Sequence, residues 1–144
     1  ATIVDLPTVT PFTRRFVADS PARDRIQVET LDVPRQRPTG KFDCAILDAF
    51  VQVLTPDDAR QALINIGEVI SPGGRIYIRG HILDDSRLSP RDTVLGNLVV
   101  LNIYRGGPFY TEQEYRDWLT EAGFVDIEHV TEPQNMMLAR KRAS

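Results

Sequence analysis

Three carboxylates follow three strand-like segments of this sequence. Asp5 follows the apolar run at 1–4, Asp32 follows the alternating apolar and polar stretch at 25–31, and Asp48 lies near the end of the apolar run at 42–50. In a parallel sheet the carboxyl ends of the strands share one edge, and ligands bind beyond that edge. A carboxylate there can accept hydrogen bonds from the two hydroxyls of a ribose. A single Asp at such a place is most often a helix cap or turn former, whereas three in succession favour a nucleoside site.

The elements that would position these carboxylates alternate between strand and helix periodicity. Strands are predicted at 1–4, 25–31, 42–50, 75–82, 125–130 and 135–140. Helices are predicted at 10–18, 55–70, 89–104 (capped by Ser89) and from Thr111 to Gly123, with the SPGG stretch at 71–74 ending the second of them. This order predicts an α/β fold, a Rossmann-like doubly wound and mostly parallel sheet with helices on both faces. The short link between the last two strands predicts a C-terminal antiparallel hairpin. We expect a single domain over residues 1–144.

Composition excludes several classes of protein. Hydrophobic residues make up 42% and charged residues 26% of the 144 residues, which is ordinary for a globular domain. The net charge of −3 lacks the basic bias of a nucleic-acid groove. Cys44 is the only cysteine, so no disulfide framework and no cysteine-based metal site are expected. No apolar run reaches the ~18 residues of a membrane helix. These features favour a cytoplasmic protein that contacts neither nucleic acid nor membrane.

A family resemblance rests on four ordered stretches. They are VDLP, DRIQVETLDV, FDCAILDAFVQVLTPDDARQALINIGEVISPGGRIYI and YTEQEYRDWLTEAGF. Their order and spacing over residues 1 to about 130 resemble the class I S-adenosylmethionine-dependent O-methyltransferases, of the caffeate/acetylserotonin type and its bacterial natural-product branch. The resemblance implies S-adenosyl-L-methionine as cofactor. It also implies secondary metabolism and a small-molecule acceptor, a hydroxyl of an aromatic or polyketide-like compound.

The resemblance also implies roles for individual residues. Asp5, with Leu6 beside it, would grip the ribose diol, and Asp32 and Val33 would flank the adenine. Asp48 and Ala49 would lie near the adenosine and methionine parts, and Phe50 close to the methyl donor. The acceptor residues would be Asn97, Tyr104 and His81, although Asn97 is equally well read as a satisfied polar residue of a core helix. Phe109, Tyr110, Tyr115 and Trp118 either line an aromatic pocket or, as we favour, pack helix onto sheet.

The chain departs from the family pattern at the catalytic base. Gln52 stands where the family has a catalytic His. An amide cannot take up a proton near neutral pH, and a positioned base contributes roughly two to four orders of magnitude to such a reaction. An already acidic phenol, proximity alone, or transfer to carbon or nitrogen would each fit Gln52, and so would a loss of methylation.

A second departure concerns the glycine-rich loop of the family, which would lie about one strand–helix unit before residue 1. The resemblance therefore implies an N-terminally truncated catalytic domain without its first strand and this loop. RGGP at 105–108 is no substitute, because it follows a helix. The family's dimerisation region is also expected to be missing, which leaves a monomer and a homodimer both open.

Two other function classes stay open beside methyl transfer. A non-catalytic ligand-binding or assembly module derived from a methyltransferase would explain both Gln52 and the missing loop. A nicotinamide-dependent nucleoside-binding enzyme would use the same sheet, but the chain contains no G-x-G-x-x-G stretch.

Overall fold

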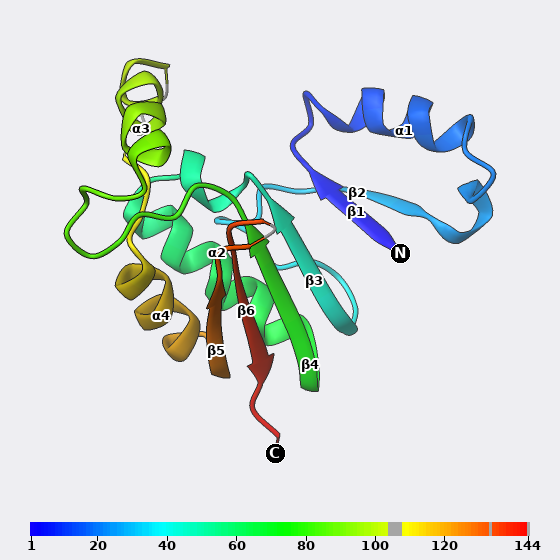
Figure 1. Cartoon of the computed structure of the whole chain (residues 1–144). Coiled ribbons are helices and arrows are strands. Elements are labelled where there is room, and N and C mark those ends of the chain that lie inside the picture. Colours follow the sequence, from blue (N-terminus) through cyan, green and yellow to red (C-terminus); the bar gives the residue numbers. More distant parts are fainter. Residues whose placement is uncertain (104–107, 133, 144) are drawn as a thin grey trace.

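Strands and helices alternate along the chain in the computed structural model, which describes residues 1–103, 108–132 and 134–143 (Figure 1). The predicted α/β class is confirmed. The elements are β1 (Thr2–Asp5), α1 (Thr10–Ala18), η1 (Arg23–Arg25), β2 (Gln27–Thr30), β3 (Phe42–Asp48), η2 (Val51–Val53), α2 (Pro56–Val69), β4 (Ile70–Arg79), α3 (Arg91–Ile103), α4 (Glu112–Glu121), β5 (Phe124–Val130) and β6 (Met136–Lys141).

The described strands form two sheets. β1 and β2 pair in parallel, and a four-stranded sheet has the order β3-β4-β6-β5. β3 and β4 are parallel, with Asp48 opposite Arg79 at their carboxyl ends. The arrowheads of β1, β3 and β4 point toward the same side of the molecule in Figure 1. The strands that carry the candidate carboxylates therefore end on one side.

The last two strands form the predicted antiparallel hairpin. β6 is also antiparallel to β4, so it lies inside the sheet, between β4 and β5. The edge strand β5 thus runs in the same direction as β3 and β4.

The SPGG stretch does not lie between helix and strand as predicted. β4 already begins at Ile70, directly after α2. The pairing with β3 jumps from Phe42 opposite Ile70 to Cys44 opposite Arg75, so residues 71–74 bulge out of the ladder. Gly73 has a φ of 78°, a left-handed conformation that glycine adopts without steric penalty. The helix thus ends at Val69, just before this stretch, and the proline and glycines form a bulge within β4.

Helix α2 forms much of the core through the face that its periodicity predicts. Thr55 caps it by accepting a hydrogen bond from the Asp58 N–H at 3.2 Å, and Pro56 occupies the first turn. Its buried residues are Ala59, Ala62, Leu63, Ile66, Gly67 and Val69. Ala59, Ala62, Leu63 and Ile66 share one hydrophobic cluster with strand residues that include Leu47, Ile76, Ile78 and Met137.

Helix α3 begins at Arg91 rather than at the predicted Ser89 cap, and it projects from the rest of the molecule (Figure 1). Many of its apolar side chains are exposed, namely Leu95, Leu98, Val99, Leu101 and Ile103. Among the described residues, no helix combines the length and apolarity needed to cross a membrane.

Replacing Thr111 by alanine is expected to lower the free energy of unfolding by about 1 kcal/mol. Thr111 caps α4 by accepting from the Glu114 N–H at 3.3 Å, while the Glu114 carboxylate accepts from the Thr111 N–H at 2.7 Å. The variant loses the first of these bonds. Urea denaturation measures the change, with Thr120→Ala on the same helix as control, because that exposed hydroxyl only adds a bond to a carbonyl already within the helix. Equal destabilisation by both variants would contradict this account of the cap.

Candidate functional site

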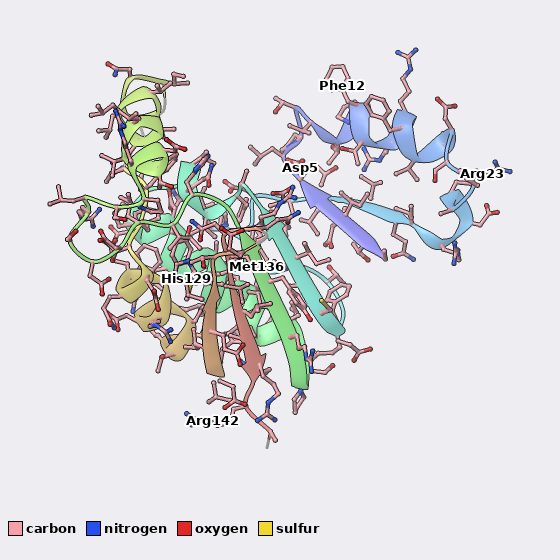
Figure 2. The ribbon with its side chains drawn as sticks, in the orientation of Figure 1. Asp5, Phe12, Arg23, His129, Met136 and Arg142 are labelled. Atoms are coloured by element: carbon pink, nitrogen blue, oxygen red, sulfur yellow. The ribbon has the colours of Figure 1, made fainter. Side chains whose placement is uncertain are left out.

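The candidate site lies where β1, β2, β3 and β4 end. Asp5 is the last residue of β1, and Figure 2 shows it at the tip of that strand. Asp32 lies two residues beyond β2, which pairs with β1 in parallel. Parallel pairing brings the carboxyl ends of neighbouring strands together, so Asp5 and Asp32 follow adjacent strand ends.

Asp5 and Asp32 keep carboxylate oxygens available. Asp5 is half-buried, and its Oδ1 accepts a hydrogen bond from the Leu6 N–H at 2.8 Å. Asp32 is also half-buried, and its carboxylate has no hydrogen-bond partner among the residues that the structure describes. Val33 is buried in the core, where its carbonyl accepts from the Asn65 amide at 2.7 Å. These groups fit an adenosine. The Asp5 and Asp32 carboxylates can accept hydrogen bonds from hydroxyl or amino groups, and the buried Val33 offers an apolar contact beside them.

Asp48 is engaged differently from Asp5 and Asp32. Its Oδ1 accepts from Arg79 Nε at 2.7 Å, and its Oδ2 accepts from Arg79 Nη2, which makes a two-pronged ion pair between β3 and β4. This hydrogen bonding lowers the pKa of the Asp48 carboxyl group. Two of the three predicted carboxylates thus follow adjacent strand ends and keep at least one oxygen available, while the third is paired.

Arg79 was not among the predicted site residues. The sequence does contain a pattern that could have indicated it: Arg79 is a charged residue directly after the apolar run of 76–78, at the expected end of a strand. Its pairing with Asp48 depends on the register between two strands, which the sequence does not state.

A sharp turn at Ala49 directs the chain from β3 toward the end of β4. Ala49 has a φ of 51°, an uncommon conformation for a residue with a side chain. Its N–H donates to the Arg79 carbonyl at 2.9 Å, which fixes the turn against β4. Ala49 itself is exposed, and Phe50 packs against the core. The turn leads into η2, which carries Gln52.

Gln52 is one of the few buried polar residues of the described chain, with 9% of its surface exposed. Its Oε1 accepts a hydrogen bond from the His81 N–H at 2.8 Å. Gly80 makes room for this contact, since a Cβ there would lie 2.4 Å from the same oxygen. The side chain that replaces the expected base is therefore held rigidly between the ends of β3 and β4.

His81 and Asn97 meet at Phe109. The exposed His81 ring stacks on Phe109 with 4.7 Å between centroids and 10° between planes. Asn97 lies on α3, and its Oδ1 accepts from the Phe109 N–H at 2.7 Å. Asn97 thus ties α3 to the chain before α4. Tyr104, the other predicted acceptor residue, lies outside the described residues.

The second histidine is held in a structural network. His129 Nδ1 lies 2.7 Å from Glu112 Oε2, and its Nε2 lies 2.6 Å from Asn135 Oδ1. Both ring nitrogens are therefore occupied, which fits a role in joining β5 to α4. Two surface hollows of about 320 and 250 Å³ lie away from the candidate site, the first around residues 37–41 and the second along β4 and β6.

The fold is that of an α/β protein with acceptor groups at the carboxyl ends of its parallel strands, which is where such folds bind ligands. The sequence profile of the O-methyltransferase domain family matches residues 1–125. The chain therefore belongs to this family.

Three relatives illustrate the similarity. The chain is 27% identical over 143 residues to the tetracenomycin polyketide synthesis 8-O-methyl transferase TcmO of Streptomyces glaucescens, covering 98% of this chain and 42% of that protein. It is 27% identical over 126 residues to the L-tyrosine C(3)-methyltransferase of Streptomyces lavendulae, covering 86% and 34%. The crystal structure of human N-acetylserotonin methyltransferase in complex with SAM superposes with a TM-score of 0.83 at 25% identity, covering 99% and 40%. The chain thus spans less than half the length of each of them.

Proposed function

We propose that this chain forms part of an S-adenosylmethionine-dependent methyltransferase acting on a small molecule. The observation that carries the proposal is the placement of Asp5 and Asp32, half-buried and with free acceptor oxygens, beyond adjacent parallel strands of an O-methyltransferase family domain. Asp5 would hold the ribose hydroxyls, while Asp32 and the buried Val33 would flank the adenine. When bound, S-adenosylmethionine supplies a methyl group activated by a sulfonium.

The acceptor we propose is the hydroxyl of an aromatic or polyketide-like compound. The polyketide 8-O-methyl transferase among the relatives supports this class. A relative whose name states methylation of tyrosine at C(3) shows that the similarity extends to carbon acceptors. His81, stacked flat on Phe109 beside Gln52, offers an aromatic surface suited to such a ring.

A second candidate is a non-catalytic ligand-binding module of the same ancestry. The observation that favours it is Gln52, since its amide carbonyl is occupied by the His81 N–H and the group cannot act as a base. Such a module would bind S-adenosylhomocysteine and an acceptor without turning over.

Replacing Asp5 by asparagine is expected to weaken binding of S-adenosylhomocysteine about tenfold or more. Asparagine keeps an acceptor for the Leu6 N–H but removes the charge, and a hydrogen bond to a charged group contributes roughly 1.5–3 kcal/mol. Isothermal titration calorimetry measures the affinity, with the exposed Asp24→Asn as control.

For the unmodified chain, ligand at 100 times its dissociation constant adds about 2.7 kcal/mol to the free energy of unfolding. Absence of any shift in melting temperature would count against the proposed function.

A further inference from the structure

Of the two polar atoms of the Gln52 side-chain amide, only Oε1 makes a hydrogen bond to the described residues. A backbone N–H can only donate, so the atom that faces His81 N must be the amide oxygen, and the Nε2 group points elsewhere. Nε2 makes no hydrogen bond to any residue that the structure describes. Over that same part of the chain, no buried side-chain nitrogen or oxygen is without a partner. Nε2 is therefore a donor at the surface of the site, on a side chain that is otherwise buried.

The groups around this donor are poor proton acceptors or are exposed. Asp48 is paired with Arg79, whose hydrogen bonds lower the pKa of the Asp48 carboxyl group and so make it a weaker base. His81 follows β4, and its ring lies flat on Phe109. In the first turn of α2, Asp57 is exposed and Asp58 pairs with Arg35, and the Tyr110 hydroxyl before α4 donates to the Leu54 carbonyl. A rigid N–H donor beside an aromatic stack matches an aromatic ring that carries an oxygen with available lone pairs.

We propose that Gln52 is a binding residue that donates a hydrogen bond from Nε2 to the oxygen anion of the acceptor, and that this chain takes acidic phenols that ionise without an enzymic base. The inference rests on the proposed function, since it specifies the acceptor of the same site. Gln52 then selects the phenolate from the equilibrium mixture in solution. No proton is transferred to the protein.

The test uses 4-nitrophenol, whose absorption spectrum distinguishes the phenol from the phenolate. It is titrated with the whole chain across its own ionisation range, with and without S-adenosylhomocysteine. The bound probe is expected to ionise about one pH unit lower than the free probe, which corresponds to about tenfold tighter binding of the phenolate. 4-Nitroanisole, which cannot ionise, is the matched ligand control.

Two variants separate the donor from its surroundings. Gln52→Glu keeps an acceptor for the His81 N–H and replaces the donor by a carboxylate oxygen, so the downward shift should vanish while binding of 4-nitroanisole is kept. Gly80→Ala places a Cβ 2.4 Å from Gln52 Oε1, which forces the amide to rotate and should reduce the shift. Gln27→Glu, the same substitution at an exposed position of β2, should leave the shift unchanged.

Several results would overturn the proposal. One is binding of the probe with an unshifted ionisation, and another is absence of binding. A third is loss of the shift in His81→Gln together with its retention in Gln52→Glu, which would assign the effect to the imidazole. Binding of S-adenosylhomocysteine without a phenolate shift defeats this inference alone, whereas a phenolate shift without cofactor binding defeats the proposed function alone.

Discussion

Replacing Gly67 by alanine is expected to lower the free energy of unfolding by about 2 kcal/mol or more. Inside a helix this substitution ordinarily raises stability by up to ~1 kcal/mol, because alanine is the better helix former. At Gly67 a Cβ would lie 2.4 Å from the backbone oxygen of Ala122 at the end of α4. Backbone cannot rotate away as a side chain can, so α2 and α4 must separate. Overpacking of this kind costs roughly 1–3 kcal/mol and sometimes more.

The same carbonyl has a second role that the substitution disturbs. Ala122 O accepts a hydrogen bond from Lys141 Nζ at 2.7 Å, which joins the end of α4 to β6. Urea denaturation of the Gly67→Ala chain measures the loss. Gly96→Ala in α3 is the matched control, because its Cβ would first meet the Phe109 ring at 3.4 Å, an ordinary contact. That control should be neutral or slightly stabilising, and a stabilised Gly67→Ala chain would contradict the close approach.

Local patterns determine much of this fold, and the sequence therefore predicts those parts well. α2 shows why: Thr55 and Pro56 define its start, and its apolar residues recur at helical spacing on one face. The apolar run of β3, of which only Leu47 is buried, and the capping box at Thr111 are equally local. Each of these features is complete within one short segment.

The candidate site depends on contacts between segments, and there the sequence is less informative. Asp48 ends a strand as Asp5 does, yet the register of β3 against β4 gives it Arg79 as a partner 31 residues away. The orientation of the Gln52 amide depends on the backbone N–H of His81, and on position 80 being a glycine, because a Cβ there would collide with Gln52 Oε1. Periodicity places Gln52 beyond a strand end, but only the packed structure shows which end of its amide is free.

Stability is expected to fall steeply between pH 10 and pH 12, because two tyrosines are buried. Tyr110 and Tyr115 are each 1% exposed, with their rings edge-to-face at 6.3 Å, so these residues pack the core rather than line an open pocket. Burial raises the pKa of Tyr110 to about 12 and raises that of Tyr115 as well. Both folded-state values lie above the unfolded value of 10.0.

The sign of the effect follows from proton binding. Between these values the unfolded chain has lost the phenolic proton that the folded chain keeps, so the stabilising contribution is complete below pH 10 and is lost as the pH rises. Each tyrosine then lowers the free energy of unfolding by about 1.4 kcal/mol per pH unit. Lys141 acts in the opposite direction, because burial lowers the pKa of its ammonium group.

Tyr115→Phe isolates one of these contributions. The ring keeps its edge-to-face contact with Trp118 at 6.1 Å, while the ionisable hydroxyl is removed. Urea titrations at a series of pH values from 8 to 12 should show equal slopes below pH 10 and, above it, a shallower decline for the variant by about 1.4 kcal/mol per pH unit. Relative to its parent, the variant should therefore gain stability toward the alkaline end of the series. Repeating the series in 1 M NaCl separates burial from general charge repulsion, because salt screens exposed charges and leaves buried groups largely unaffected. Parallel curves for the two chains would show that Tyr115 ionises as readily in the folded state as in the unfolded one.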